Sequence, residues 1–77
     1  MSPLDLKGER CPMNLVRVRL ALEPLPPGAA LEVWVWDAEG LQNLPKSLSA
    51  QGHRVEAPEG LSLPPGAPAR LIIHKGA

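Results

Sequence analysis

Residues 4–22 read LDLKGERCPMNLVRVRLAL, and within this stretch the pattern changes from strand to helix. A short apolar segment, residues 3–6, leads into the junction RCPMN at residues 10–14, and a helical run of residues 15–22 leads out of it. Proline is favoured at the first position of a helix because its missing N–H would have no partner there. The junction therefore predicts that Cys11 lies at or beside the N-cap of the first helix.

Cys11 is the only cysteine in the sequence. The unpaired N–H groups and the positive end of the helix dipole favour an anion at a helix N-terminus, and a thiol placed there becomes a thiolate more readily. A lone cysteine in a small domain is also commonly a buried small hydrophobe. On the residues alone we therefore keep both interpretations, an activated nucleophile and a structural thiol.

Length and charge narrow the class of protein. The chain has 77 residues, enough for one domain with a modest core. Its formal net charge is zero, so no overall field attracts nucleic acid or an anionic membrane, and we expect neither as a direct partner. Because no signal-peptide pattern and no apolar run of roughly 20 residues is present, we predict a cytoplasmic protein in which the single thiol stays reduced.

The hydrophobic periodicity predicts six elements. In chain order we expect a strand at 3–7, a helix at about 12–23, a strand at 30–37, a helix ending near 51, and strands at 53–57 and 69–75. Residues 37–40 are interpreted as a turn. Pro45 leaves two readings: the regular helix begins near Asn43 with Pro45 in its first turn, or Pro45 bends a longer helix. Gly52 is the expected C′ residue.

This order predicts an α/β fold, a two-layer sandwich in which two helices cover one face of a four-stranded mixed sheet. The β-α-β start should make the first two strands parallel. We expect a core face formed by Leu4, Leu6, Leu31, Val33, Val35, Val55, Leu71 and Ile73. The opposite face should carry Glu32, Trp34, Trp36, Arg54, Glu56, Arg70, Ile72 and His74. In the first helix, the expected apolar stripe is Leu15, Val18 and Leu22, and the more polar side is Asn14, Arg17 and Ala21.

Two tryptophans alternate onto the sheet face that the helices do not cover. Large apolar groups gathered at a surface often mark an interface, so Trp34 and Trp36 suggest a weak homodimer. The alternative is that the proline-rich loop at 58–68 folds over them. His53 and His74 lie on separate expected strands without ligand spacing, so we expect structural or solvated histidines, no metal and no cofactor.

The pattern L-D-x-x-G-x-x-C-P at residues 4–12 resembles the opening of the TusA/SirA-like sulfur-carrier family. Further matches are Leu15, Val18, Arg19, Pro27-Gly28, Asp37, Leu44-Pro45 and Gly52-His53. The resemblance covers nearly the whole chain and implies a single domain of this family over residues 1–77. The family motif is C-P-x-P, and this sequence departs from it because Asn14 replaces the second proline.

The resemblance implies that Cys11 accepts sulfur as a persulfide from a cysteine desulfurase or another donor protein and passes it to an acceptor protein. Known outcomes in the family include tRNA thiolation, cofactor synthesis and sulfur oxidation. Arg10, Pro12, Met13 and Asn14 are the expected supporting residues. The charge of Arg10 would lower the thiol pKa, or Arg10 is simply solvated, as we expect for Arg17. Two other classes remain open: a regulatory or interaction module with an idle cysteine, and a thiol enzyme acting alone on a small sulfur donor.

Overall fold

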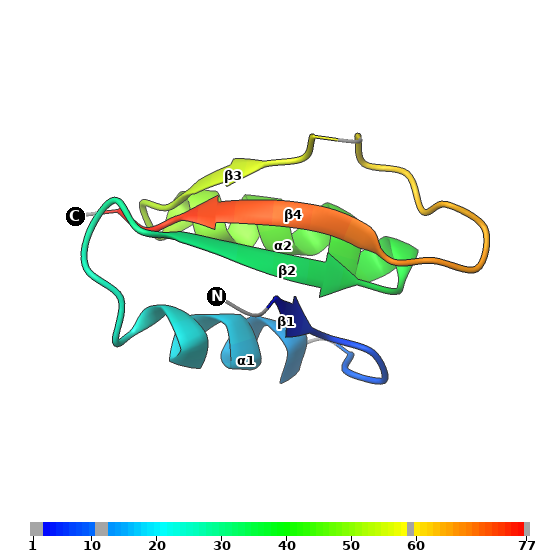
Figure 1. Ribbon diagram of the computed structural model, residues 1–77, viewed down its shortest axis with the longest axis horizontal. Coiled ribbons are helices and arrows are strands. Elements are labelled where there is room, and N and C mark those ends of the chain that lie inside the picture. Colours follow the sequence, from blue (N-terminus) through cyan, green and yellow to red (C-terminus); the bar gives the residue numbers. More distant parts are fainter. Residues whose placement is uncertain (1–2, 11–12, 59, 77) are drawn as a thin grey trace.

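The computed structural model describes residues 3–10, 13–58 and 60–76. Across these residues the chain forms two helices and a four-stranded sheet (Figure 1). The elements are β1 (Leu4–Asp5), α1 (Met13–Leu22), β2 (Ala30–Val35), α2 (Ala38–Ala50), β3 (Arg54–Glu56) and β4 (Ala69–His74). The predicted order of elements is confirmed, and the strands are shorter than the sequence suggested.

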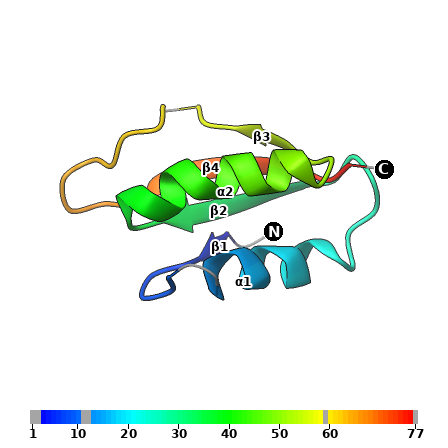
Figure 2. The ribbon, with the colours of Figure 1, turned by 180° about the vertical axis from the view of Figure 1, so that it is seen from behind.

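The sheet has the strand order β1-β2-β4-β3. β1 pairs with β2 in parallel, as predicted, and β4 runs antiparallel to both β2 and β3. Figure 1 looks onto the sheet face without a helix in front of β2 and β4, and Figure 2, from behind, shows α2 lying across the other face. The predicted two-layer α/β sandwich is confirmed.

The core forms where alternate residues of the central strands meet the helices. On β2 and β4 the register places Leu31 opposite Ile73 and Val33 opposite Leu71, and all four side chains are buried. Burying a side chain of this kind stabilises the fold by about 1.5–3 kcal/mol. The predicted core face is confirmed, although its members Leu4 and Val55 are only partly buried against the core.

α2 begins at Ala38, earlier than the start near Asn43 that one of the two predictions gave. Asp37 is its N-cap, and the Asp37 Oδ2 atom accepts a hydrogen bond from the Gly40 N–H at 2.8 Å. The predicted turn at 37–40 is therefore wrong: those residues are the cap and the first helical turn, and Pro45 lies inside the longer helix. At the other end, the N–H groups of Gly52 and His53 donate to the carbonyls of Ser49 and Leu48, so Gly52 is the C′ residue, as predicted.

The buried side of α1 also differs from the prediction. Val18 and Leu22 are buried as expected, but so is Asn14, while Leu15 is only partly buried. Ala21 packs partly against the core. Asn14 and Ala21 were assigned to the polar side because the apolar stripe was expected to start at Leu15. The true stripe follows positions 14, 18 and 22, so the helix is rotated relative to the predicted stripe.

A lysine joins the end of the sheet to the end of α1. The Lys75 Nζ atom donates to the backbone carbonyl of Glu23 at 3.0 Å and to that of Leu25 at 2.6 Å. A cation at a helix C-terminus satisfies carbonyl groups that have no partner within the helix. Neither helix in the described ranges is both long and apolar enough to cross a membrane.

Candidate functional site at the start of α1

The segment that leads into the junction is held by the sheet and by a tight turn. The Leu6 N–H donates to the Trp34 carbonyl at 3.0 Å, and the Leu6 side chain is buried. The Glu9 N–H then donates back to the Leu6 carbonyl at 3.0 Å. Gly8, within this turn, has a φ of 83°, a conformation that favours glycine. The backbone is thus fixed up to the residues before the predicted nucleophile.

Cys11 and Pro12 lie outside the described residues. Their neighbours on both sides are at the surface: Arg10 is exposed, and the Met13 side chain, at the first position of α1, is 51% exposed. Cys11-Pro12 therefore connects two surface positions in the sequence. The roles of Cys11 and Pro12 stay predictions.

Asn14 is bound by both its backbone and its side chain. Its N–H donates to the Arg10 carbonyl at 3.0 Å, a bond that a proline could not make. The residue is only 2% exposed, and its Oδ1 accepts the Leu15 N–H at 2.7 Å. Its Nδ2 has no hydrogen-bond partner within the described part of the chain. The predicted supporting residue is thus a buried contact of α1 rather than a surface group.

Gly40 of α2 receives this buried side chain. A Cβ atom at position 40 would lie 2.8 Å from Asn14 Nδ2 and 2.8 Å from Asp37 Oδ1. Such distances are too short for a side chain, so the absence of one allows the first turns of α1 and α2 to approach. The sequence analysis missed this contact because Gly40 was interpreted as part of a turn. Its signal was a glycine three residues after a good N-cap residue.

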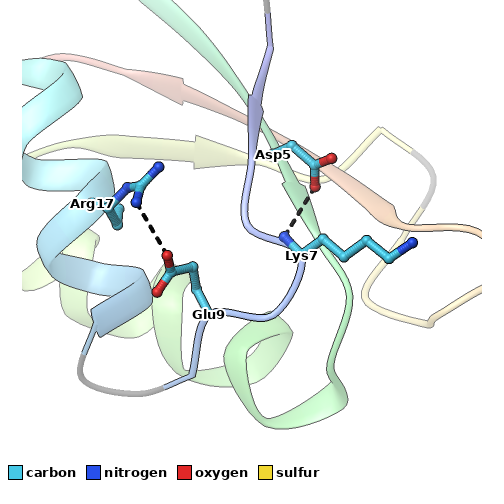
Figure 3. A network of polar contacts seen from close by, with 4 residues as sticks. All are labelled: Asp5, Lys7, Glu9 and Arg17. Atoms are coloured by element: carbon cyan, nitrogen blue, oxygen red, sulfur yellow. Dashed lines mark hydrogen bonds and ion pairs between the residues drawn. The ribbon is translucent and has the colours of Figure 1, made fainter.

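An ion pair connects the segment before residues 10–14 to α1. Arg17 Nη1 lies 3.1 Å from Glu9 Oε1, and Figure 3 shows the two side chains meeting beside the start of the helix. Arg17, expected to be solvated, is half-exposed and paired. A nearby bond between Lys7 N–H and Asp5 Oδ1, at 3.0 Å, stabilises the preceding turn (Figure 3).

The outer face of α1 is apolar. Met13, Val16 and Leu20 are 51%, 38% and 58% exposed, and their spacing places them on one side of the helix. Val16 and Leu20 also line a shallow pocket of about 150 Å³ together with Arg19 and Glu23. Sequence analysis assigned no role to Val16 or Leu20. Their signal was that both are apolar and fall outside the stripe expected to face the core.

The tryptophans lie half-buried on the uncovered sheet face. Trp34 Nε1 donates to Glu32 Oε2 at 2.7 Å, and Trp36 Nε1 donates to Asp5 Oδ1 at 2.6 Å. The Lys7 Nζ atom lies 4.8 Å from the centre of the Trp36 ring. Both indoles therefore have local polar partners, and the homodimer through Trp34 and Trp36 stays a prediction.

The histidines take part in local contacts. His53 Nδ1 accepts the Gly76 N–H at 3.0 Å, which favours the structural one of the two expected roles, structural or solvated. His74 Nε2 lies 2.9 Å from Glu56 Oε1 on the neighbouring strand. Among the described residues, no three His, Cys, Asp or Glu side chains are grouped so that they could hold a metal ion.

Comparisons with known proteins agree with the resemblance seen in the sequence. A protein from Thermotoga maritima is 36% identical over 52 residues, which are 68% of this chain and 66% of the relative. A protein from Archaeoglobus fulgidus is 33% identical over 52 residues, 68% of this chain and 59% of the relative. Both bear the name "Putative sulfur carrier protein". The matched stretch thus spans less than two thirds of each relative's length.

No solved structure gave a significant match to the chain. The family described as "Sulfurtransferase TusA" matches residues 3–62, which contain β1, α1, β2, α2, β3 and the junction between them. This match covers well over half of the sequence, and the chain therefore belongs to the TusA sulfurtransferase family.

Proposed function

We propose that this protein is a sulfur carrier that accepts sulfur as a persulfide on Cys11 and passes it to a partner protein. One observation carries the proposal: the described part of α1 starts at Met13, two positions after Cys11 in the sequence. The family and the names of the two relatives support the same role.

The helix start supplies the electrostatics that a carrier thiol needs. N–H groups in the first turn of a helix and the helix dipole stabilise a nearby anion by about 0.3–1 kcal/mol. No acidic residue lies in the first turn of α1 to oppose this effect. Arg10 adds a positive charge one residue before the thiol in the sequence, and a neighbouring cation lowers a thiol pKa. These effects favour the thiolate of Cys11 and the persulfide anion formed on it.

The transfer step is a thiol–disulfide type of exchange. The Cys11 thiolate attacks the outer sulfur of a donor persulfide, and a new S–S bond forms as the donor's own S–S bond breaks. The donor cysteine leaves as a thiolate with the electron pair, so no external oxidant or reductant is needed. An acceptor thiolate then takes the outer sulfur from Cys11 in the same way.

The outer face of α1 is the proposed docking surface for the donor and acceptor proteins. The docking surface consists of Met13, Val16 and Leu20, with the exposed Arg17 and Arg19 beside them. Apolar residues flanked by arginine are typical of protein interfaces. This surface begins two residues after Cys11. We place the relay in the cytoplasm, where thiols stay reduced, and the acceptor determines whether sulfur reaches tRNA thiolation or another product.

Sulfur loading tests the proposal directly. Purified protein is incubated with a cysteine desulfurase and cysteine, and intact mass is measured before and after reduction. We expect one added sulfur atom that reduction removes, and none on the Cys11→Ser variant. A Cys11→Ser protein that still gains sulfur would overturn the role of Cys11. A wild-type protein that gains none from any donor would favour the regulatory module instead, and turnover of a small sulfur donor without a partner would favour the enzyme.

A further inference from the structure

We propose that Asn14 is a positioning residue for Cys11, because it ties the chain around the thiol to the N-terminal turn of α2. The inference rests on the proposed function in that Cys11 is the reacting group. Asn14 acts through the backbone and through packing, and no contact between Asn14 and the sulfur is required.

The first anchor is the backbone hydrogen bond between Arg10 and Asn14. The Asn14 N–H donates to the Arg10 carbonyl at 3.0 Å, so the bond joins the residues on the two sides of Cys11-Pro12-Met13. The spacing of four residues is that of the α-helix. Because proline has no N–H, a proline at position 14 would leave the Arg10 carbonyl without this donor. Asn14 therefore adds a constraint that the C-P-x-P motif cannot have.

The second anchor is the side chain of Asn14, which is wedged against α2. Its Nδ2 faces the space that a side chain at Gly40 would fill, and Asp37 Oδ1 borders the same space. The amide orientation follows from its surroundings: Oδ1 accepts the Leu15 N–H, and the reversed orientation would turn the amide oxygen toward the Asp37 carboxylate. Asn14 Nδ2 and Asp37 Oδ1 thus border the same space, each 2.8 Å from the point where a Cβ atom of residue 40 would lie.

Packing alone does not account for an asparagine at this position. The residue is 2% exposed, and its Nδ2 has no hydrogen-bond partner in the described ranges. Burying an unpaired N–H is unfavourable for folding. An apolar residue of similar size would avoid that cost, and the helical conformation itself does not require an asparagine at a buried position. The side chain is better explained by its position, which couples the residues flanking Cys11 to a second helix.

The coupling has a measurable consequence for the thiol. A thiolate benefits from a helix N-terminus only while the first turn is held in place, since the effect falls off within one turn. Loosening either anchor should therefore raise the pKa of the Cys11 thiol and slow its alkylation at neutral pH. From the usual strength of the helix-dipole effect, we expect roughly a two- to fivefold loss of rate.

Three variants and one control separate the anchors. Asn14→Ala keeps the backbone N–H and removes the side chain, and Asn14→Pro removes both. Gly40→Ala displaces the Asn14 side chain and the Asp37 carboxylate without changing a residue of α1. Asn43→Ala is the matched control, because Asn43 is exposed on α2. The rate of iodoacetamide reaction is measured against pH for each, with thermal unfolding followed in parallel. We expect the thiol pKa to rise in Asn14→Ala and Gly40→Ala, to rise most in Asn14→Pro, and to stay unchanged in Asn43→Ala.

The double variant Asn14→Ala/Gly40→Ala should be no more affected than Asn14→Ala, because both changes break the same contact. An unchanged thiol pKa in folded Asn14→Ala overturns the proposal. Where a variant fails to fold, amide hydrogen exchange of the wild-type protein decides: the Asn14 N–H should be protected, and exchange at the rate of an unfolded peptide overturns the inference. Alkylation needs no sulfur donor, so a failure to carry sulfur would refute the proposed function while these shifts would still show the positioning.

Discussion

The two helices cover the same face of the sheet, yet their exposed surfaces differ in polarity. α2 buries Leu41, Leu44 and Leu48 and exposes polar residues. Those exposed polar residues are Glu39, Gln42, Asn43, Lys46 and Ser49. α1 buries Val18 and Leu22 but also exposes Met13, Val16 and Leu20. A helix that serves only the fold needs one apolar face. The second apolar face of α1 is not needed for the core, and it fits the proposed docking surface.

The largest expected effect compares a leucine from each helix. Leu48 of α2 is completely buried, whereas Leu20 of α1 is 58% exposed. Leu48→Ala should lower the free energy of unfolding by about 2–5 kcal/mol, because it leaves a cavity in the core. Leu20→Ala should change it by about 0.5 kcal/mol or less. Denaturant unfolding measures both, and equal losses would show that α1 needs its outer leucine for folding.

The next effect concerns the transfer of sulfur rather than stability. The double variant Val16→Ser/Leu20→Ser removes most of the docking surface. Truncating central interface residues commonly costs more than 1 kcal/mol, so we expect about a tenfold slower loading by the desulfurase at low concentrations of the carrier.

The control for this prediction is Gln42→Ser/Lys46→Ser on the outer face of α2, which should load at the wild-type rate. Both double variants should unfold at nearly the same denaturant concentration as the wild type. Wild-type loading by Val16→Ser/Leu20→Ser would mean that partners approach another surface.

The smallest expected effect concerns the N-terminal turns. Asp37 caps α2 through the Gly40 N–H, and no acidic residue lies in the first turn of α1. Asp37→Ala should reduce the free energy of unfolding by about 1 kcal/mol. Asp37→Asn, which still offers a capping oxygen, should keep most of that stability. If both substitutions were equally harmful, the charge of Asp37 rather than its cap would be the important feature.

The sheet was predictable because side chains of a strand alternate between its two faces with a period of two residues. A wrong strand boundary therefore does not change which residues share a face. Leu31, Val33 and Val35 alternate with polar or aromatic residues, and the structure buries all three. The same pattern in Leu71 and Ile73 correctly identified the partner strand. These faces follow from local sequence alone.

The helices were less predictable because a contact between distant residues overrides local propensity. Asn14 lies outside the apolar stripe expected for the first helix, and glycine is a weak helix former, so the sequence placed Asn14 on the polar side of that helix and Gly40 in a turn. In the structure Asn14 can be buried because residue 40 is a glycine: the amide of Asn14 occupies the space that a side chain at Gly40 would fill. Asp37 and Gly40 indicate where α2 begins, but neither segment alone indicates that Asn14 packs there, although the match to the TusA family still located the thiol segment.

The place of β4 has a consequence for the order of assembly. Residues 69–74 occupy an interior position between β2 and β3, although they come after both in the described part of the chain. A chain emerging from the ribosome therefore cannot complete the sheet until this segment has been made. Lys75, which binds the carbonyls at the end of α1, follows directly after it. Pairings between distant segments form late in folding. During synthesis, Cys11 is therefore made well before the strand that completes the sheet.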